Sequence, residues 1–250
     1  MNIKPSFIII GAQKAGTTSL YEMLIQHSQL LGSTTKEVHY FDRDEWYHQQ
    51  NIDEYHHYFP TVESKANVLS FEATPMYLFH PEVAERLYQY NAQLKLIVLL
   101  RNPVERALSA WTMYHYSMKG DPRTFEQAIA QELRDYDRLS YYNNKICYVK
   151  RGVYHEQIER YLKLFPKEQL LFLDSNEFKT MPSVVLEKVT SFLGVRNEEI
   201  KLLHSNASKV ENKQDYPKQL ARLKEFYESY NYRLYELLGN DYGWDANTSS

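Results

Sequence analysis

Residues 6–18 read Ser6-Phe7-Ile8-Ile9-Ile10-Gly11-Ala12-Gln13-Lys14-Ala15-Gly16-Thr17-Thr18. The apolar, largely β-branched start is typical of a buried strand, and the two glycines end it. Residues 17–27 then repeat apolar side chains with the period of a helix. A strand, a glycine loop and a helix in this order predict an anion-binding loop, because backbone N–H groups and the helix N-terminus can surround a phosphate.

Short apolar runs alternate with longer helical segments through the rest of the chain. Strands are expected at residues 68–73, 95–100 and 169–173, and helices at 81–90, 104–118, 125–136, 153–165, 183–193 and 218–238. This alternation predicts an α/β fold with a central, largely parallel β-sheet flanked by helices. We expect one domain over residues 1–250, with 246–250 as a loose C-terminal tail.

Composition narrows the classes of function. The 250 residues include 29 Lys and Arg against 32 Asp and Glu, so no broad cationic field is expected and nucleic acid is excluded as a partner. The single cysteine, Cys147, allows no intrachain disulfide. No apolar run approaches the ~20 residues of a spanning helix, and the N-terminus has no secretory signal pattern. These features predict a cytoplasmic protein without a membrane partner.

The glycine loop departs from that of ATP-using enzymes. It keeps the two glycines of G-x-x-x-x-G-K-[ST], but Thr17 stands at the lysine position and Lys14 lies inside the loop. The run Lys95–Leu100 ends in Arg101, where a Mg²⁺-binding enzyme would carry an acidic residue. We therefore expect phosphate binding without a metal. Scattered histidines at 48, 56 and 57 do not form a metal-ligand pattern.

Two further motifs follow. With the glycine loop as the first motif, the second reads Arg101-Asn102-Pro103-Val104-Glu105-Arg106-Ala107-Leu108-Ser109-Ala110-Trp111, and the third reads Arg151-Gly152-Val153-Tyr154. Arg101, at a strand end, can offer a planar fork to phosphate oxygens, and Ser109 adds a neutral donor. For Arg106, a salt bridge to an outward carboxylate is as reasonable as a place in the site.

These motifs resemble those of sulfotransferases that use 3′-phosphoadenosine-5′-phosphosulfate (PAPS). The glycine loop is similar to their 5′-phosphosulfate loop, and Arg101–Trp111 to the stretch that holds the 3′-phosphate. The third motif resembles the heparan sulfate, or Golgi-type, branch more than the cytosolic aryl and alcohol branch. The resemblance implies a P-loop-like sulfotransferase fold, release of 3′-phosphoadenosine 5′-phosphate (PAP), and no metal. The cofactor-binding residues that it implies are Gln13, Lys14, Ala15, Gly16, Thr17, Thr18, Arg101, Ser109, Arg151, Gly152 and Tyr154.

Acid–base candidates lie in Lys36-Glu37-Val38-His39-Tyr40-Phe41. In a strand, Glu37 and His39 would point the same way. Glu37 is favoured as general base, with His39 as its orienting partner or as the base itself, while Lys14 would neutralise the leaving oxygen. The alternative is that Glu37 is a surface carboxylate paired with Lys36. Glu72 is a candidate second carboxylate on the acceptor side, although Ala73 stands where the family often carries a lysine.

The predicted reaction is sulfuryl transfer from PAPS to a hydroxyl or amine. The chain has no cluster of Lys and Arg outside the nucleotide motifs, which favours a neutral or cationic small molecule, a natural product, or a carrier-tethered acyl group. The 22 tyrosines could line an aromatic acceptor pocket or pack half-buried. Lys209 is a candidate for a loop that covers the nucleotide. The alternatives are a P-loop nucleotide kinase and a non-catalytic nucleotide-binding module.

Overall fold

The structure, a computed structural model, describes residues 3–49, 51–62, 67–117, 120–142, 146–203 and 213–245. Its contacts divide the chain into two compact units. The first comprises Met1–Leu100 and Arg160–Ser205, and the second comprises Arg101–Glu159 and Asn206–Ser250. The expected single domain stays a prediction. Lys209 and the expected tail at 246–250 lie outside the described residues.

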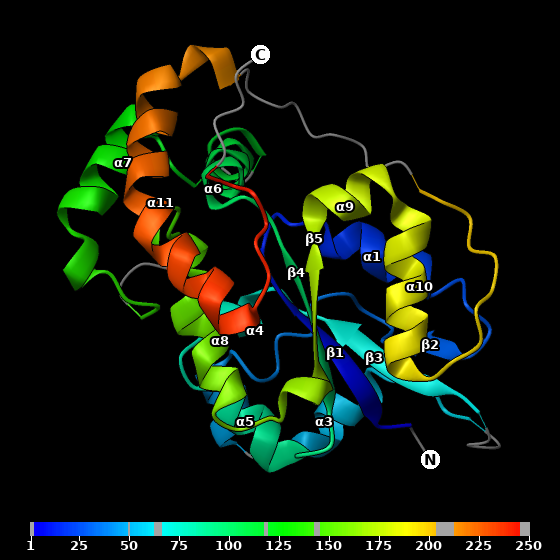
Figure 1. Cartoon of the computed structure of the whole chain (residues 1–250). Helices are drawn as coiled ribbons and strands as arrows, with labels where there is room; N and C mark the ends of the chain where they lie inside the picture. Colours follow the sequence, from blue (N-terminus) through cyan, green and yellow to red (C-terminus); the bar gives the residue numbers. More distant parts are fainter. Residues whose placement is uncertain are drawn as a thin grey trace. The chain divides into compact units, whose positions relative to one another are not determined.

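A five-stranded parallel sheet forms the centre of the first unit (Figure 1). Its strands are β1 (Pro5–Gly11), β2 (Leu30–Gly32), β3 (Leu69–Ala73), β4 (Lys95–Leu100) and β5 (Leu170–Asp174), in the order β2-β3-β1-β4-β5. All four pairings are parallel. The middle strands β1 and β4 are almost wholly buried, as their continuous apolar runs predict. The predicted α/β class is confirmed.

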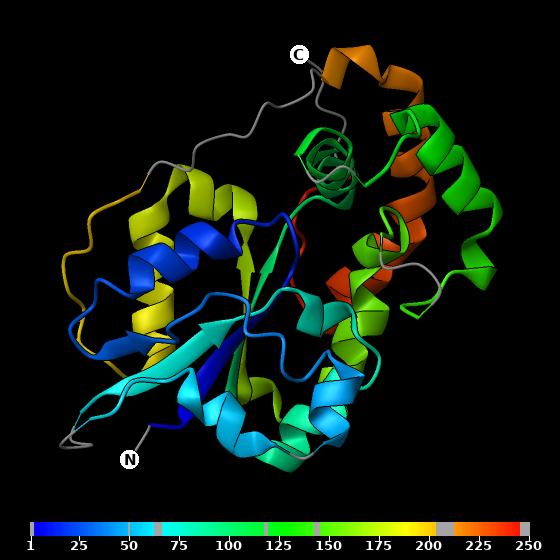
Figure 2. The same cartoon turned by 180° about the vertical axis from the view of Figure 1, so that it is seen from behind.

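Helices cover both sides of this sheet. Helices α1 (Thr17–Leu24) and α10 (Pro182–Leu193) lie on one side, and α3 (Ile52–His57) and α5 (Val83–Tyr90) on the other (Figures 1 and 2). The described part of the unit also contains the short helices α2 (Asp44–His48), α4 (Met76–Phe79) and α9 (Ser175–Thr180). Sequence periodicity did not predict α2, α3, α4 or α9, because one or two turns are too few to establish a period.

The second unit is helical. It contains α6 (Pro103–Thr112), a π-helical turn (Met113–Ser117), α7 (Phe125–Arg134), a 3-10 turn (Lys150–Gly152), the start of α8 (Tyr154–Leu162) and α11 (Pro217–Leu238). Its core combines apolar side chains from α6, α7 and α11 with residues 148–153, including Trp111, Phe125, Tyr148, Leu223 and Tyr227. Asn102 caps α6, because its side chain accepts from the Val104 N–H at 3.0 Å.

Many tyrosines belong to the cores rather than to a pocket. Tyr55, Tyr77, Tyr148, Tyr161 and Tyr227 are fully buried, and the hydroxyl of each is hydrogen-bonded. Cys147 is buried and is not part of a disulfide. In the described part of the chain, none of the helices combines the length and the apolar character that crossing a membrane requires.

Candidate active site

The glycine loop, Gly11–Gly16, connects the carboxyl end of β1 to α1. Two hydrogen bonds fix it to neighbouring elements. The Ala12 N–H donates to the Leu99 carbonyl of β4, and the Ser175 hydroxyl at the start of α9 donates to the Ala15 carbonyl, both at 2.7 Å. Both bonds come from the β4–β5 side of β1, so the loop is anchored to β4 and to the helix that follows β5.

Gly16 ends the loop as the N-cap of α1, with φ 106°. A Cβ there would lie 3.3 Å from Leu99 Cδ2, so backbone conformation and space both favour glycine. Within the described residues, no side chain caps α1 and its first turn holds no acidic residue. The first-turn N–H groups and the positive end of the helix can thus interact with an anion.

Lys14 is half-buried in the same loop, with a left-handed φ of 69°. The structure thus brings one part of the predicted site together on a loop and a helix start: Gln13, Lys14, Ala15, Gly16, Thr17 and Thr18. Thr17 is buried and Thr18 is exposed.

The acid–base segment, Lys36–Asp42, is a loop rather than the expected strand. Glu37 and His39 have φ angles of 61° and 58°, both left-handed. The strand geometry was therefore the wrong reason for pairing them. Their side chains nevertheless meet, with His39 Nε2 3.4 Å from Glu37 Oε2. Lys36 Nζ lies 2.5 Å from Glu37 Oε1, so the ion pair considered as an alternative is also present.

Asp42 extends this contact into a chain of three groups. Its Oδ2 lies 2.8 Å from His39 Nδ1, and its side chain is only 5% exposed. The imidazole therefore lies between two carboxylates, one half-exposed and one buried. Sequence reasoning missed Asp42, although a carboxylate three residues after a candidate histidine was an available signal.

The pKa values of Glu37 and His39 are shifted in opposite directions. Burial acts to raise the pKa of Glu37, but hydrogen bonds from His39 and Lys36 outweigh it and lower the pKa to about 2. Burial acts to lower the pKa of His39, but hydrogen bonds with Asp42 and Glu37 raise it to about 9. At neutral pH the pair is thus a carboxylate and an imidazolium.

The acid–base segment and the glycine loop share one edge of the sheet. The Glu37 N–H donates to the carbonyl of Ala73, the last residue of β3, at 3.1 Å. Ala73 pairs with Ile9 of β1, and the Thr74 N–H donates to the Ile9 carbonyl. Because β1 and β3 are adjacent and parallel, both segments lie at their carboxyl ends, where α/β sheets place ligands.

Glu72, the candidate second carboxylate, lies in the protein interior. Its side chain is fully buried, and burial raises its pKa against the hydrogen bonds that it accepts from Thr74, Tyr55 and Tyr77. The predicted second carboxylate on the acceptor side is thus an internal group, because β3, the strand that contains it, is buried at this position.

In the second unit, Arg101 precedes α6 and Ser109 lies two turns along it; both are half-buried. Arg101 Nη2 is 3.3 Å from Glu105 Oε2, and Glu105 also forms an ion pair with Lys213. Arg106 is fully buried and donates to the Tyr148 carbonyl. The outward salt bridge considered for Arg106 is therefore wrong.

The third motif contacts the second within this unit. The Tyr154 hydroxyl donates to the Arg101 carbonyl at 2.9 Å. A Cβ on Gly152 would lie 2.5 Å from the Tyr227 hydroxyl, so only glycine fits this close approach. Arg151 and Tyr154 are both buried. The structure thus brings Arg101, Gly152 and Tyr154 into one packed region.

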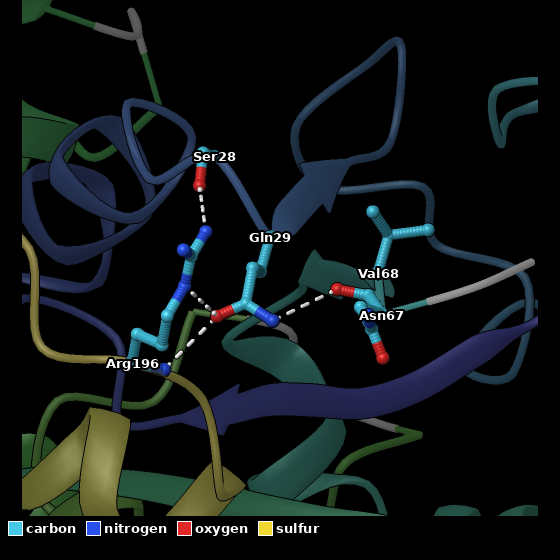
Figure 3. A pocket seen from close by; sticks show the side chains of 5 residues that line it. All are labelled: Ser28, Gln29, Asn67, Val68 and Arg196. Carbon is cyan, nitrogen blue, oxygen red and sulfur yellow. Dashed lines mark hydrogen bonds between the residues drawn. The ribbon is translucent and has the colours of Figure 1, made fainter.

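A separate pocket lies at the opposite end of the strands from the glycine loop. It is lined by Ser28, Gln29, Asn67, Val68 and Arg196 (Figure 3). Four of these residues directly precede β2 or β3, so the pocket is at the amino ends of those strands. Gln29 Oε1 accepts from the Arg196 backbone N–H at 2.9 Å. None of the predicted site residues lines this pocket.

A family model described as the sulfotransferase domain matches residues 4–233. The chain belongs to this sulfotransferase family. The match spans the glycine loop, the acid–base segment and both motifs of the second unit. The predicted enzyme class is confirmed.

Two curated relatives and one solved structure support the assignment. Heparan sulfate glucosamine 3-O-sulfotransferase 5 of Mus musculus is 28% identical over 262 residues, covering 96% of this chain and 74% of the relative. Bifunctional heparan sulfate N-deacetylase/N-sulfotransferase 3 of Homo sapiens is 34% identical over 200 residues, covering 76% of this chain and 22% of the relative. A crystal structure of a sulfotransferase from Alicyclobacillus acidocaldarius has a TM-score of 0.80 and 29% identity, covering 97% of this chain and 99% of that one. The predicted likeness to the Golgi-type branch is confirmed.

Proposed function

We propose that this sulfotransferase transfers a sulfuryl group from PAPS to a hydroxyl or amine, with Glu37 as the general base. The observation that carries this proposal is the Glu37–His39–Asp42 chain, which lies at the same edge of the sheet as the glycine loop. A base and an anion-binding loop at one edge are the two parts that group transfer to an acceptor requires.

The chain's residues fit this cofactor. When bound, PAPS supplies the sulfuryl group and a phosphate leaving group. The first-turn N–H groups of α1 and the Lys14 ammonium would hold the 5′-phosphosulfate and neutralise charge on the leaving oxygen. Arg101 and Ser109 would hold the 3′-phosphate, which requires the Arg101 guanidinium to exchange Glu105 for phosphate oxygens.

The protonation states favour Glu37 over His39 as base. With its pKa raised to about 9, the His39 imidazole is protonated at neutral pH and has no lone pair to accept a proton. Glu37 is ionised, so its carboxylate can take the acceptor's proton. His39, oriented by Asp42, would position this carboxylate rather than act on the acceptor.

The sequence around the acid–base segment has a net negative charge, which favours some classes of acceptor over others. Residues 33–92 contain ten Asp and Glu against four Lys and Arg. The net negative charge of residues 33–92 repels a polyanion and favours a neutral or cationic molecule. The two relatives are named for heparan sulfate, which is a polyanion. We therefore propose that this enzyme differs from them in acceptor, and uses a small molecule, a natural product or a carrier-tethered acyl group.

An acceptor screen with ³⁵S-labelled PAPS in the presence of a chelator tests this proposal. The panel contains neutral and cationic alcohols and amines, a carrier protein bearing a hydroxyacyl group, and heparan sulfate oligosaccharides. We expect transfer to an alcohol, to an amine or to the carrier-bound hydroxyacyl group, and loss of this transfer in Glu37→Gln. Transfer to heparan sulfate alone would overturn the proposed acceptor class. Mg²⁺-dependent ATP turnover without sulfuryl transfer would instead favour the alternative function, a P-loop nucleotide kinase.

A further inference from the structure

We propose that Glu72 is a positioning residue for catalysis, which holds the acid–base segment in place through the hydroxyls of Thr74 and Tyr77. This inference rests on the proposed function, because it explains how Glu37 and His39 keep the geometry that sulfuryl transfer needs. In the described part of the chain, the hydrogen-bond partners of Glu72 do not include either residue. It acts through the two hydroxyls that lie between it and the backbone of the segment.

Glu72 lies on β3 and is inaccessible to solvent. Its Oε1 accepts from the Tyr55 hydroxyl at 2.7 Å and from the Tyr77 hydroxyl at 3.0 Å. Its Oε2 accepts from Thr74 Oγ1 at 2.6 Å. A buried carboxylate is costly unless it is hydrogen-bonded, and three hydroxyl donors from α3, α4 and the end of β3 meet that requirement.

Two of these hydroxyls also accept from the acid–base segment. The His39 N–H donates to Thr74 Oγ1 at 3.5 Å. The N–H groups of Tyr40 and Phe41 donate to the Tyr77 hydroxyl at 3.1 and 3.5 Å. The N–H groups of residues 39–41 are thus bound to two hydroxyls, and both hydroxyls donate their own protons to Glu72.

The direction of the hydrogen bonds at Thr74 and Tyr77 explains how Glu72 can position the segment. A hydroxyl has one proton and two lone pairs. The carboxyl oxygens of Glu72 accept the protons of Thr74 and of Tyr77, which leaves the lone pairs of these hydroxyls for the amides of the segment. A neutral apolar residue at position 72 would leave both hydroxyls free to turn.

The segment needs such support because of its backbone. Glu37 and His39 both have left-handed φ angles, which cost free energy in residues with a Cβ and persist only where neighbouring structure holds them. The bonds from 39–41 to Tyr77 and Thr74, together with the Glu37 N–H bond to Ala73, provide that support.

Tyr55 offers a matched control. Its hydroxyl donates to the same oxygen of Glu72 as the Tyr77 hydroxyl does, and its ring also packs against Tyr40 and Phe41. Within the described residues, however, no amide of the acid–base segment donates to the Tyr55 hydroxyl. Tyr55→Phe and Tyr77→Phe each remove one hydroxyl from one carboxylate oxygen in the core. Only Tyr77→Phe also removes the acceptor of the Tyr40 and Phe41 amides.

The experiment compares these two variants in the full chain. We expect similar decreases in Tm, with PAP affinity unchanged in both. Turnover at saturating PAPS should fall about 10- to 100-fold in Tyr77→Phe, the scale of a misplaced catalytic group, and less than about 3-fold in Tyr55→Phe. Thr74→Val should lose more turnover than Thr74→Ser, which keeps the hydroxyl. Equal losses in Tyr55→Phe and Tyr77→Phe would overturn the proposal.

A titration of the His39 imidazole by NMR provides a readout that needs no acceptor. We expect its pKa, about 9 in the wild type, to fall in Tyr77→Phe but not in Tyr55→Phe, because the ring leaves its place between Glu37 and Asp42. An unchanged titration in Tyr77→Phe would overturn the positioning role. Absence of sulfuryl transfer by the wild-type protein, with the titration as expected, would overturn the proposed function alone.

Discussion

The Tyr154 hydroxyl donates a hydrogen bond to the carbonyl oxygen of Arg101, 53 residues earlier in the chain, at 2.9 Å. This bond joins the first residue of the second motif to the last residue of the third. It fixes the backbone from which the Arg101 side chain extends, immediately before α6. The two motifs of the second unit therefore form one structural element rather than two independent ones.

Arg101→Ala should weaken PAP binding. A charge-assisted hydrogen bond to phosphate contributes about 1.5–3 kcal/mol, which corresponds to a dissociation constant roughly 10- to 150-fold higher. Isothermal titration calorimetry in the presence of a chelator measures this dissociation constant. Arg134→Ala, which removes a guanidinium that is 70% exposed at the end of α7, is the control and should leave the affinity unchanged. Equal affinity in Arg101→Ala and the wild type would remove Arg101 from the site.

Tyr154→Phe tests the same region without changing its charge. The variant keeps the buried ring and loses only the bond to the Arg101 carbonyl, so we expect about 1 kcal/mol lower stability. PAP affinity should fall by less than in Arg101→Ala, because the guanidinium remains. Urea unfolding and calorimetry on the same samples measure both effects. A larger loss of affinity in Tyr154→Phe than in Arg101→Ala would contradict this order.

Glu37→Gln should separate chemistry from binding. Glutamine keeps the size of the side chain but cannot take a proton, so we expect turnover to fall by ~10²–10⁴ while PAP still binds. Asp42→Asn should have a smaller effect, because it changes only the group that orients His39. Single-turnover kinetics with labelled PAPS measure these differences. Near-normal turnover in Glu37→Gln together with inactivity of His39→Ala would make His39 the base.

Stability should depend on pH through His39. Its pKa is 6.5 in an ordinary environment and about 9 in the folded protein, so folding favours the protonated form. The resulting stabilisation is fully present below about pH 6.5 and is lost as the pH rises through about 9. For Glu37, whose pKa is lowered to about 2, the stabilisation is present above about pH 4.5 and is lost as the pH falls toward 2.

Urea unfolding of the wild type and of His39→Gln at about pH 6 and about pH 10 checks this dependence. The wild type should lose more stability between the two values than His39→Gln does. His48→Gln, which changes an exposed histidine, should behave like the wild type. Parallel losses in all three proteins would show that His39 does not titrate as described.

Sequence patterns predicted the sheet well because its central strands are buried on both faces. The run Lys95–Leu100 coincides with β4, and the predicted strand at 169–173 differs from β5 by one residue at each end. The strand β2, only three residues long, was not predicted, because three residues carry no usable period. The predicted helix at 104–118 instead changes to a π-helical turn after Thr112, and hydrophobic period does not detect that change.

The site was predicted as residue types rather than as geometry. The glycine loop and the motif from Arg101 have fixed spacings, so their residues could be named. The contacts of Glu37 could not be derived in the same way, because they depend on left-handed backbone that neither residue type favours. Asp42 could have been found by its spacing of three residues from His39. Thr74 and Tyr77 become visible as partners only in the folded chain, since tertiary packing brings them to the acid–base segment. The cofactor residues, the absence of a metal and the cytoplasmic location stay predictions.

The left-handed backbone at Glu37 and His39 also determines which replacements a mutational library can tolerate. Valine, isoleucine and threonine are strained at such φ angles, so these variants should be depleted from the soluble fraction of expressing cells. Glycine and asparagine adopt the same backbone readily, so they should accumulate as folded but inactive protein. A screen that records abundance and activity separately would therefore find, at these two positions, that the substitutions best tolerated for expression are not those that preserve turnover.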